Sequence, residues 1–263
     1  MVNIRFFRLP YFKLVSVLMA VVLIGSIFAC QSDKKNKKNK SSKSADFTYM
    51  STGISGFSGI CLGKTPQTFL ALSDRNGLYE ISEDGSINRR INALGYQDME
   101  GICINTSNNQ VYLVEETQMR VYRLSEDEKT LERFIDVVVP QGEINKGIEG
   151  IACGKDTLYV VNQDSPPLLI KYNLTTGKEV QRTVLNFAGF LSDIFYDETD
   201  DTLWIADSKK QKIFHCDLNG EVIDDQNISF VKKPEALMVD RKSNVAWVGC
   251  DETGYLYKVK LKI

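Results

Sequence analysis

Acidic residues recur at two kinds of position after residue 45. Some lie at the starts of short apolar segments, and others lie at or directly after the ends of such segments. If the segments are arranged around one axis, these carboxylates meet at one mouth of a channel. Like charges that lie so close cannot all stay ionised without a neighbouring Lys or Arg, a raised pKa or a bound cation. The ten acids are Asp74, Asp98, Glu100, Glu115, Glu116, Glu149, Asp193, Asp207, Glu235 and Asp251.

A hard cation is the sharpest chemical interpretation of such a cluster. Ca²⁺ takes six to eight oxygen ligands from carboxylates, carbonyls and water, so Ca²⁺ is the one cofactor that the sequence suggests. The sequence argues against zinc, because His215 is its one histidine and its cysteines lack close ligand spacing. We expect Lys146 to be the basic residue nearest to the acids.

Two other roles for the acids stay open. Glu and Asp at the starts of repeats can accept hydrogen bonds from backbone N–H groups of the next repeat and so tie the repeats together. They can also serve in catalysis, with Glu100 or Glu149 as a general base. The chain has no Ser-His-Asp set, phosphate-cradling Gly loop or nucleotide fingerprint. No catalytic residue is therefore assigned.

The elements that must position the acids form five repeats with a period of 42 to 49 residues, the range of propeller blades. The repeats begin at Ser58-Gly59-Ile60, Glu100-Gly101-Ile102, Glu149-Gly150-Ile151, Ser192-Asp193-Ile194 and Glu235-Ala236-Leu237. In each repeat, two further segments follow, the second with alternating polarity. Turn pairs such as Asp84-Gly85 and Asn219-Gly220 separate the segments, as in β-hairpins.

The repeats predict an all-β fold, because no segment of the body has a helical period. A four-stranded sheet of this kind buries its faces only against its neighbours, so radial closure is the natural arrangement. The fifth repeat ends after its third strand, and residues 46–50 can supply the fourth. We therefore predict a five-bladed β-propeller over residues 46–263, closed by an N-terminal strand in the last blade.

The N-terminal segment has the pattern of an export signal. Basic residues precede an apolar run over residues 14–28, which is short for a membrane span. The run ends in Ile27-Phe28-Ala29-Cys30, which resembles a bacterial lipobox. The resemblance implies a signal peptide over residues 1–29 and acylation of Cys30, with palmitate among the acyl groups. Residues 30–45, with six lysines, then form a flexible tether. A plain signal peptide and an uncleaved anchor are the alternatives.

Charge and cysteine content exclude several classes of protein. Residues 46–263 carry 23 basic and 33 acidic residues, a net charge of −10. Nucleic-acid affinity rests on Lys and Arg that displace counterions, so we expect no nucleic-acid partner. Five cysteines follow Cys30, and their odd number and even scatter argue against a disulfide framework.

The repeat motifs resemble those of the bacterial SdiA-regulated family and, more loosely, of NHL-type propellers. The resemblance covers nearly all of residues 50–263 and is most specific over residues 145–151 (Asn-Lys-Gly-Ile-Glu-Gly-Ile). It implies a five-bladed propeller, often membrane-attached, whose biochemical role is not established. The chain departs from the pattern at Asn162-Gln163 in the third repeat and at Cys250 in the fifth.

Two functions follow from these observations. The first is a binding or scaffold module, anchored by lipid in the bacterial cell envelope, which presents an acidic channel mouth to a small ligand, a cation or an envelope protein. The second is a Ca²⁺-dependent hydrolase of lactones or phosphoesters, which rests on analogy with other propellers. We expect the chain to act as a monomer.

Overall fold

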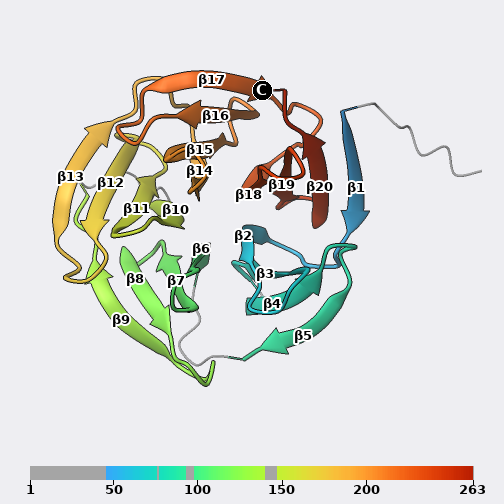
Figure 1. The fold of residues 1–263 in the computed structure, drawn as a ribbon, viewed down its shortest axis with the longest axis horizontal. Helices are drawn as coiled ribbons and strands as arrows, with labels where there is room; N and C mark the ends of the chain where they lie inside the picture. Colours follow the sequence, from blue (N-terminus) through green and yellow to red (C-terminus); the bar gives the residue numbers. More distant parts are fainter. Residues whose placement is uncertain (1–45, 76, 93–97, 140–146, 263) are drawn as a thin grey trace, which may run out of the picture. The chain divides into compact units, whose positions relative to one another are not determined.

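The computed structural model describes residues 46–75, 77–92, 98–139 and 147–262. The regular structure in these residues consists of twenty β-strands, which form five antiparallel sheets of four strands each. Figure 1 shows the sheets as blades around a central axis. This confirms the predicted five-bladed β-propeller. Within the described residues, no helix has the length and apolar character that a membrane span requires.

The strands follow the repeats of the sequence. Blade 1 contains β2 (Phe57–Leu62), β3 (Thr68–Ser73), β4 (Gly77–Ser82) and β5 (Ile87–Ile91). Blade 2 contains β6 (Met99–Asn105), β7 (Gln110–Glu115), β8 (Arg120–Leu124) and β9 (Leu131–Asp136). Blade 3 contains β10 (Ile148–Cys153), β11 (Thr157–Asn162), β12 (Leu168–Asn173) and β13 (Glu179–Val184). Blade 4 contains β14 (Leu191–Asp197), β15 (Thr202–Asp207), β16 (Lys212–Cys216) and β17 (Val222–Asn227). Blade 5 contains β18 (Pro234–Asp240), β19 (Val245–Cys250), β20 (Tyr255–Lys260) and β1 (Phe47–Ser51).

The N-terminal strand closes the ring, as predicted. Strand β1 pairs antiparallel with β20, with Thr48 opposite Lys258. Beyond the end of β1, the hydroxyl of Thr52 donates a hydrogen bond of 2.8 Å to the carbonyl of Gly254. The last blade therefore joins the two ends of the propeller domain, and Figure 1 shows β1 beside β20 on its outer edge.

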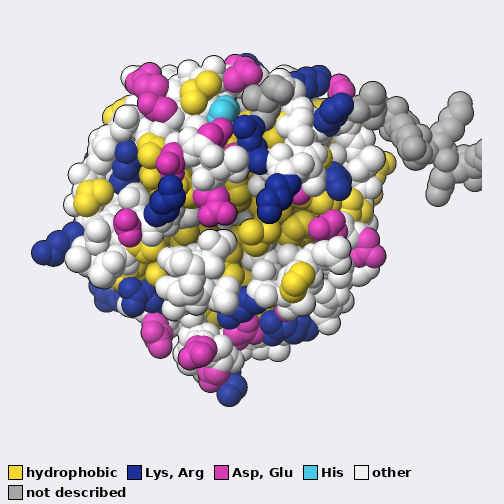
Figure 2. Space-filling view, viewed as in Figure 1, with side chains coloured by type: hydrophobic (Ala, Val, Ile, Leu, Met, Phe, Trp, Pro, Cys, Tyr) yellow, Lys and Arg dark blue, Asp and Glu magenta, His cyan; other side chains and the backbone are white. Residues whose placement is uncertain are grey.

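Burial falls from the centre of each blade to its rim. All residues of β3 and β15 are buried, whereas most residues of the outer strands β13 and β17 are exposed. The inner strands lie between neighbouring blades, so both of their faces are covered and their sequences read as nearly continuous apolar runs. On the face shown in Figure 2, acidic and basic side chains are interspersed, and apolar side chains are visible near its middle.

Five apolar clusters hold the ring together, one between each pair of neighbouring blades. The innermost strands approach one another so closely that two positions require glycine. A Cβ atom at Gly101 would lie 2.4 Å from the carbonyl oxygen of Glu149, and one at Gly150 would lie 2.7 Å from the Cα atom of Asp193. Repeats 2 and 3 therefore carry glycine at this position because the next blade packs directly on their backbone.

Several predictions fall outside the described residues. These are the signal peptide over residues 1–29, acylation of Cys30, the tether over residues 30–45, and the position of Lys146. They stay predictions.

Candidate functional site

Each innermost strand begins with the same irregularity. Its pairing with the second strand shifts register between the first and third residues, for example between Met99 and Gly101. A β-bulge of this kind bends the strand and redirects a side chain. The bulged residues are Ser58, Glu100, Glu149, Ser192 and Glu235. In each blade, the bulge therefore leaves one side chain outside the regular strand pairing. These side chains lie at the end of the central channel where the innermost strands begin.

The two serines at the bulged position tie neighbouring blades together. The hydroxyl of Ser58 donates a hydrogen bond of 2.9 Å to the carbonyl of Met99 in blade 2. The hydroxyl of Ser192 donates one of 2.7 Å to the carbonyl of Pro234 in blade 5. Blades 2, 3 and 5 instead carry a carboxyl group at this position, on Glu100, Glu149 and Glu235.

Two further positions per blade complete this end of the channel. In each blade, one position directly follows the second strand, and the other lies two residues before the bulged residue. The backbone N–H of the first donates a hydrogen bond of 2.8–3.1 Å to the carbonyl of the second. These pairs are Asp74 with Gly56, Glu116 with Asp98, Gln163 with Gly147, Ser208 with Phe190, and Asp251 with Lys233. With the bulged positions, they place seven acids at one end of the channel. We call this set the acidic mouth: Asp74, Asp98, Glu100, Glu116, Glu149, Glu235 and Asp251.

Blade 2 contributes the closest group of carboxylates. One carboxylate oxygen each of Asp98, Glu100 and Glu116 lies within 4.8 Å of the other two. Asp98 accepts a hydrogen bond of 2.5 Å from the hydroxyl of Thr117, and Glu116 accepts one of 3.0 Å from the backbone N–H of Gly147. Within the described parts of the chain, no Lys or Arg forms an ion pair with these three carboxylates. Their oxygens are hard ligands of the kind that Ca²⁺ prefers.

The blade 5 side of the acidic mouth is compensated by basic groups. The Nζ atom of Lys233 lies 2.8 Å from Glu235 and 2.7 Å from Asp251. The guanidinium of Arg75 lies 3.6 Å from Asp74 and 3.7 Å from Asp251. The Oδ1 atoms of Asp74 and Asp251 are buried and accept no hydrogen bond from a described residue. Charge is therefore balanced unevenly, with the basic groups beside blades 1 and 5 and the close triad on blade 2.

This crowding raises the pKa values of several carboxyl groups. Burial, followed by the charges of Glu235, Glu116, Asp74 and Asp98, raises the pKa of Glu100 to about 9. Burial and then the charge of Glu100 raise the pKa of Glu149 well above its usual value. The pKa of Glu235 rises to about 7, because burial outweighs the opposing effect of Lys233. The pKa of Glu100 therefore lies above neutral pH, and the pKa of Glu149 is shifted in the same direction.

Comparison with known proteins identifies the family. A family model described as SdiA-regulated matches residues 35–188, which is more than half of the chain. The chain belongs to the SdiA-regulated family. This confirms the resemblance found in the repeat motifs. A search of curated proteins found no match.

The solved structures that resemble this member of the SdiA-regulated family share its fold at low sequence identity. Glutaminyl cyclase of Myxococcus xanthus aligns with a TM-score of 0.60 and 12% identity, over 81% of this chain and 93% of that chain. A nidogen/laminin complex aligns with a TM-score of 0.53 and 14% identity, over 74% and 75% of the two chains. A Bacteroides thetaiotaomicron protein of unknown function aligns with a TM-score of 0.51 and 14% identity, over 81% and 63%. At these identities the likeness concerns the fold alone.

Three of the ten predicted acids lie outside the acidic mouth of this family member. Asp193, 1% exposed, accepts hydrogen bonds of 2.8 Å from the N–H of Ile194 and 2.6 Å from the N–H of Leu237 in blade 5. Asp207 accepts three backbone hydrogen bonds from its own blade, and Glu115 accepts one of 2.7 Å from Gln118. Asp193 and Asp207 therefore stabilise a blade contact and a loop, the structural role left open by the sequence. Burial and then the charges of Asp98 and Glu116 raise the pKa of Glu115.

Sequence reasoning missed Arg75 and Lys233 at the acidic mouth, and it noted Gln163 only as a departure from the family pattern. The side-chain amide of Gln163 donates a hydrogen bond of 2.6 Å to Glu149. Lys233 occupies in blade 5 the position that Asp98 occupies in blade 2, two residues before the bulge. Aligning the repeats at this position, and not only at the bulge, would have found Lys233.

Proposed function

We propose that this protein is a lipid-anchored binding module of the bacterial cell envelope, whose acidic mouth binds a divalent cation, with Ca²⁺ as the first candidate. One observation carries the proposal: Asp98, Glu100 and Glu116 bring three carboxylate oxygens within 4.8 Å of one another. Ca²⁺ binds carboxylate oxygens at about 2.3–2.6 Å. Oxygens that share one such ion therefore lie within about 5 Å of one another, which the triad satisfies.

The chemistry of the donors supports a cation rather than a neutral ligand. The acidic mouth holds seven carboxyl groups. Among the described residues, the basic groups that form ion pairs with them are Lys233 and Arg75, and their partners are acids of blades 1 and 5. Burial and then repulsion by the neighbouring carboxylates raise the pKa of Glu100. A cation beside the triad would relieve this repulsion and would take the place of the Glu100 proton. Three protein carboxylates leave several coordination positions of Ca²⁺ for water or for an acidic group of a ligand.

The proposed location rests on the N-terminal residues. The lipobox-like Ile27-Phe28-Ala29-Cys30 favours acylation of Cys30, and a lysine-rich tether would hold the propeller away from the membrane surface. A cation at the acidic mouth can then bridge the propeller to a carboxylate or phosphate of a small ligand or an envelope protein. In this proposal the protein acts by binding, without turnover.

The experiment is a thermal unfolding series on the purified full chain at pH 8. The protein is first stripped with EDTA and then melted with 1 mM Ca²⁺, Mg²⁺ or Mn²⁺. A site with a Kd of about 10 µM adds about 2.7 kcal/mol at 1 mM cation, a rise in Tm of several degrees. In E100Q the rise should shrink, whereas the control E132Q, on the outer strand β9, should keep it. Equal melting temperatures with EDTA and with every cation would overturn the proposal.

A second candidate is a Ca²⁺-dependent hydrolase of lactones or phosphoesters. Two neighbouring features favour it. Glu149 is 6% exposed and accepts a hydrogen bond from Gln163, and the triad of Asp98, Glu100 and Glu116 offers oxygen ligands for a cation. Such an arrangement pairs a general acid or base with a metal site. E149Q should then abolish turnover while Ca²⁺ binding persists. No turnover of lactone, ester and phosphoester substrates, with or without Ca²⁺, would reject this candidate.

A further inference from the structure

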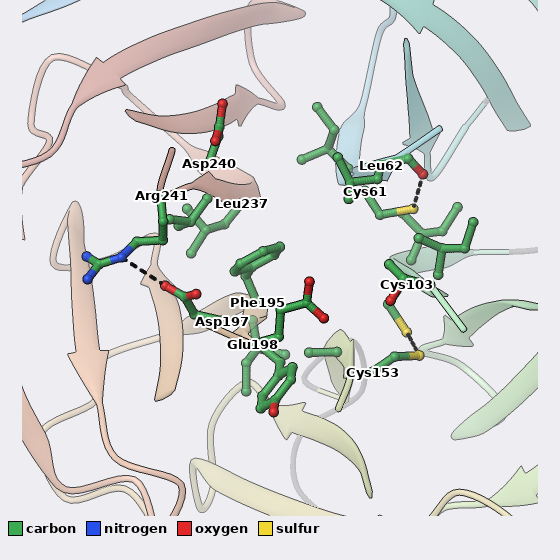
Figure 3. Close-up of a pocket in the computed structure, with 18 of the residues that line it drawn as sticks. Cys61, Leu62, Cys103, Cys153, Phe195, Asp197, Glu198, Leu237, Asp240 and Arg241 are labelled. Carbon is green, nitrogen blue, oxygen red and sulfur yellow. Dashed lines mark hydrogen bonds and ion pairs between the residues drawn. The ribbon is translucent and has the colours of Figure 1, made fainter. Parts of the chain in front are cut away.

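The other end of the innermost strands surrounds a cavity of about 350 Å³. Its wall includes Cys61, Cys103 and Cys153, from the neighbouring strands β2, β6 and β10, together with apolar residues of all five innermost strands. Figure 3 shows the three thiols on one side of the cavity, with Glu198 and the ion pair between Asp197 and Arg241 on other parts of its wall. We call this set of three cysteines the thiol end. The proposed cation site does not use them.

Two of these thiols are in direct contact. The Sγ atoms of Cys103 and Cys153 lie 2.7 Å apart. A disulfide bond is about 2.05 Å long, so a small movement of the two side chains brings the sulfurs to bonding distance. A metal ion between two thiolates would hold the sulfurs further apart, because each metal–sulfur bond is about 2.3 Å long. The contact therefore favours a bond between the sulfurs over a shared metal ion.

We propose that Cys103 and Cys153 form a reversible disulfide that links the innermost strands of blades 2 and 3. The two strands are neighbours around the axis, and their side chains also share the apolar cluster between these blades. The bond would join residues that lie 50 positions apart in the chain. It would stabilise the ring at the same two strands that carry Glu100 and Glu149 at the acidic mouth.

The oxidant that the step requires is a small-molecule disulfide, which enters through the cavity. Cys153 is the more exposed of the two thiols. Its thiolate attacks one sulfur of the oxidant, forms a mixed disulfide and releases one thiolate. Cys103 then loses its proton and attacks the sulfur of Cys153, which releases the second thiolate. In balance, two protein thiols and one small disulfide give one protein disulfide and two small thiols.

The order of attack follows from burial. Cys103 is buried, and burial together with its hydrogen bond to Cys153 raises the pKa of its thiol well above the usual value. A thiol with a raised pKa is seldom ionised at neutral pH and attacks slowly. The second step should therefore limit the rate, which should rise about tenfold per pH unit below the pKa of Cys103.

The other three cysteines of the propeller do not compete for this bond. The Sγ atom of Cys61 is directed to the backbone carbonyl of Leu62, at 3.5 Å. Cys216 and Cys250 are fully buried in the clusters between blades 3 and 4 and between blades 4 and 5. An odd number of cysteines therefore permits one bridge and three single thiols, although it argues against a framework of several bridges.

The test maps the bond in the purified full chain. The protein is reduced, freed of reductant and incubated under native conditions with excess oxidised glutathione. After an acid quench, free thiols are blocked with N-ethylmaleimide, and the digest is analysed by mass spectrometry. We expect a disulfide-linked peptide pair that contains Cys103 and Cys153, loss of two free thiols, and their full recovery with dithiothreitol. The oxidised protein should melt several degrees higher than the reduced one.

Three variants assign the roles of the cysteines. C103S should stop at a mixed disulfide of Cys153 with glutathione, and C153S should form neither product. C61S is the matched control and should form the cross-link at the wild-type rate. Recovery of Cys103 and Cys153 as maleimide adducts in the oxidised wild type would overturn the proposal, as would a linked peptide that contains Cys61. The peptide map of the wild-type protein tests the proposal even if a variant fails to fold.

Discussion

The two ends of the innermost strands carry opposite chemistry on the same scaffold. The acidic mouth lies where the strands begin, and its side chains come from bulges and from the turns beside them. The thiol end lies toward the carboxyl ends of the same strands, and its sulfurs belong to regular strand positions. Strand β6 shows the contrast most directly, because Glu100 and Cys103 are three residues apart.

The comparison shows how a propeller separates two kinds of site. Residues in bulges and turns leave the ladder, so polar groups there can turn to the axis without breaking strand pairing. Regular strand positions must fit between neighbouring blades, which admits small and weakly polar groups such as a thiol. One end therefore presents hard oxygen donors and the other presents soft sulfur.

The largest expected effect comes from disturbing the strands that the two ends share. G101A should lower the free energy of unfolding by about 3 kcal/mol or more, because its Cβ atom would lie 2.4 Å from the Glu149 carbonyl oxygen. Denaturant unfolding measures this change. G53A is the control. A Cβ atom at Gly53 would have no neighbour within 4 Å, so only the left-handed φ of +71° opposes the change, which should cost about 1 kcal/mol. Equal losses in the two variants would show that the strands are not in close contact.

The pH dependence of stability should distinguish the two ends. The folded-state pKa values of Glu100, about 9, and Glu235, about 7, lie above the ordinary value of 4.5. Above pH 4.5 the unfolded state has released these protons while the folded state still holds them. Without added cation, the free energy of unfolding should therefore fall as pH rises toward these values, by about 1.4 kcal/mol per pH unit for each retained proton.

Denaturant unfolding between pH 5 and pH 8 measures this slope. E100Q should flatten it, because glutamine has no proton to retain, whereas C153S at the thiol end should keep the wild-type slope. A stability that rises with pH over this range would contradict the raised pKa values of the acidic mouth.

In the proposed function, the affinity for Ca²⁺ should depend on pH, because the cation competes with the protons of the acidic mouth. A Ca²⁺ ion that displaces one proton from Glu100 should bind about tenfold more tightly for each unit of pH between pH 6 and pH 8. Calorimetric titrations in two buffers with different protonation enthalpies measure both the affinity and the number of protons released. Binding in E100Q should depend less on pH. A constant affinity across this range would mean that the cation does not replace a proton.

The smallest expected effect concerns the basic groups of the acidic mouth. K233M removes the cation that neutralises Glu235 and Asp251, so Ca²⁺ should bind about fivefold more tightly, a change of about 1 kcal/mol. The neighbouring variant K232M is the control, because Lys232 pairs with Glu252, which is not part of the acidic mouth. Titration of both variants with Ca²⁺ measures the difference. Weaker binding in K233M would indicate that Lys233 helps to position a cation ligand.

The sequence predicted the architecture better than the site. The period of the repeats and the apolar runs over β3 and β15 were enough for the five blades, since those strands are buried on both faces. Residues 46–50 were predicted to complete the last blade, and β1 confirms it. Seven of the ten predicted acids lie at the acidic mouth. Arg75 and Lys233 were missed, because the predicted mouth was built from the acidic residues of each repeat.

What the sequence by itself determined was the fold and the density of acids at the blade starts, because both follow from a short-range pattern repeated five times. Tertiary structure decided which acids face one another. Glu149 occupies a bulged position, whereas Asp193 occupies the next position, which is glycine in blades 1 to 3. A shift of one residue along a strand moves a side chain to the opposite face. Asp193 therefore bonds to the backbone of blade 5. The contact between Cys103 and Cys153 likewise arises only when blades 2 and 3 pack together.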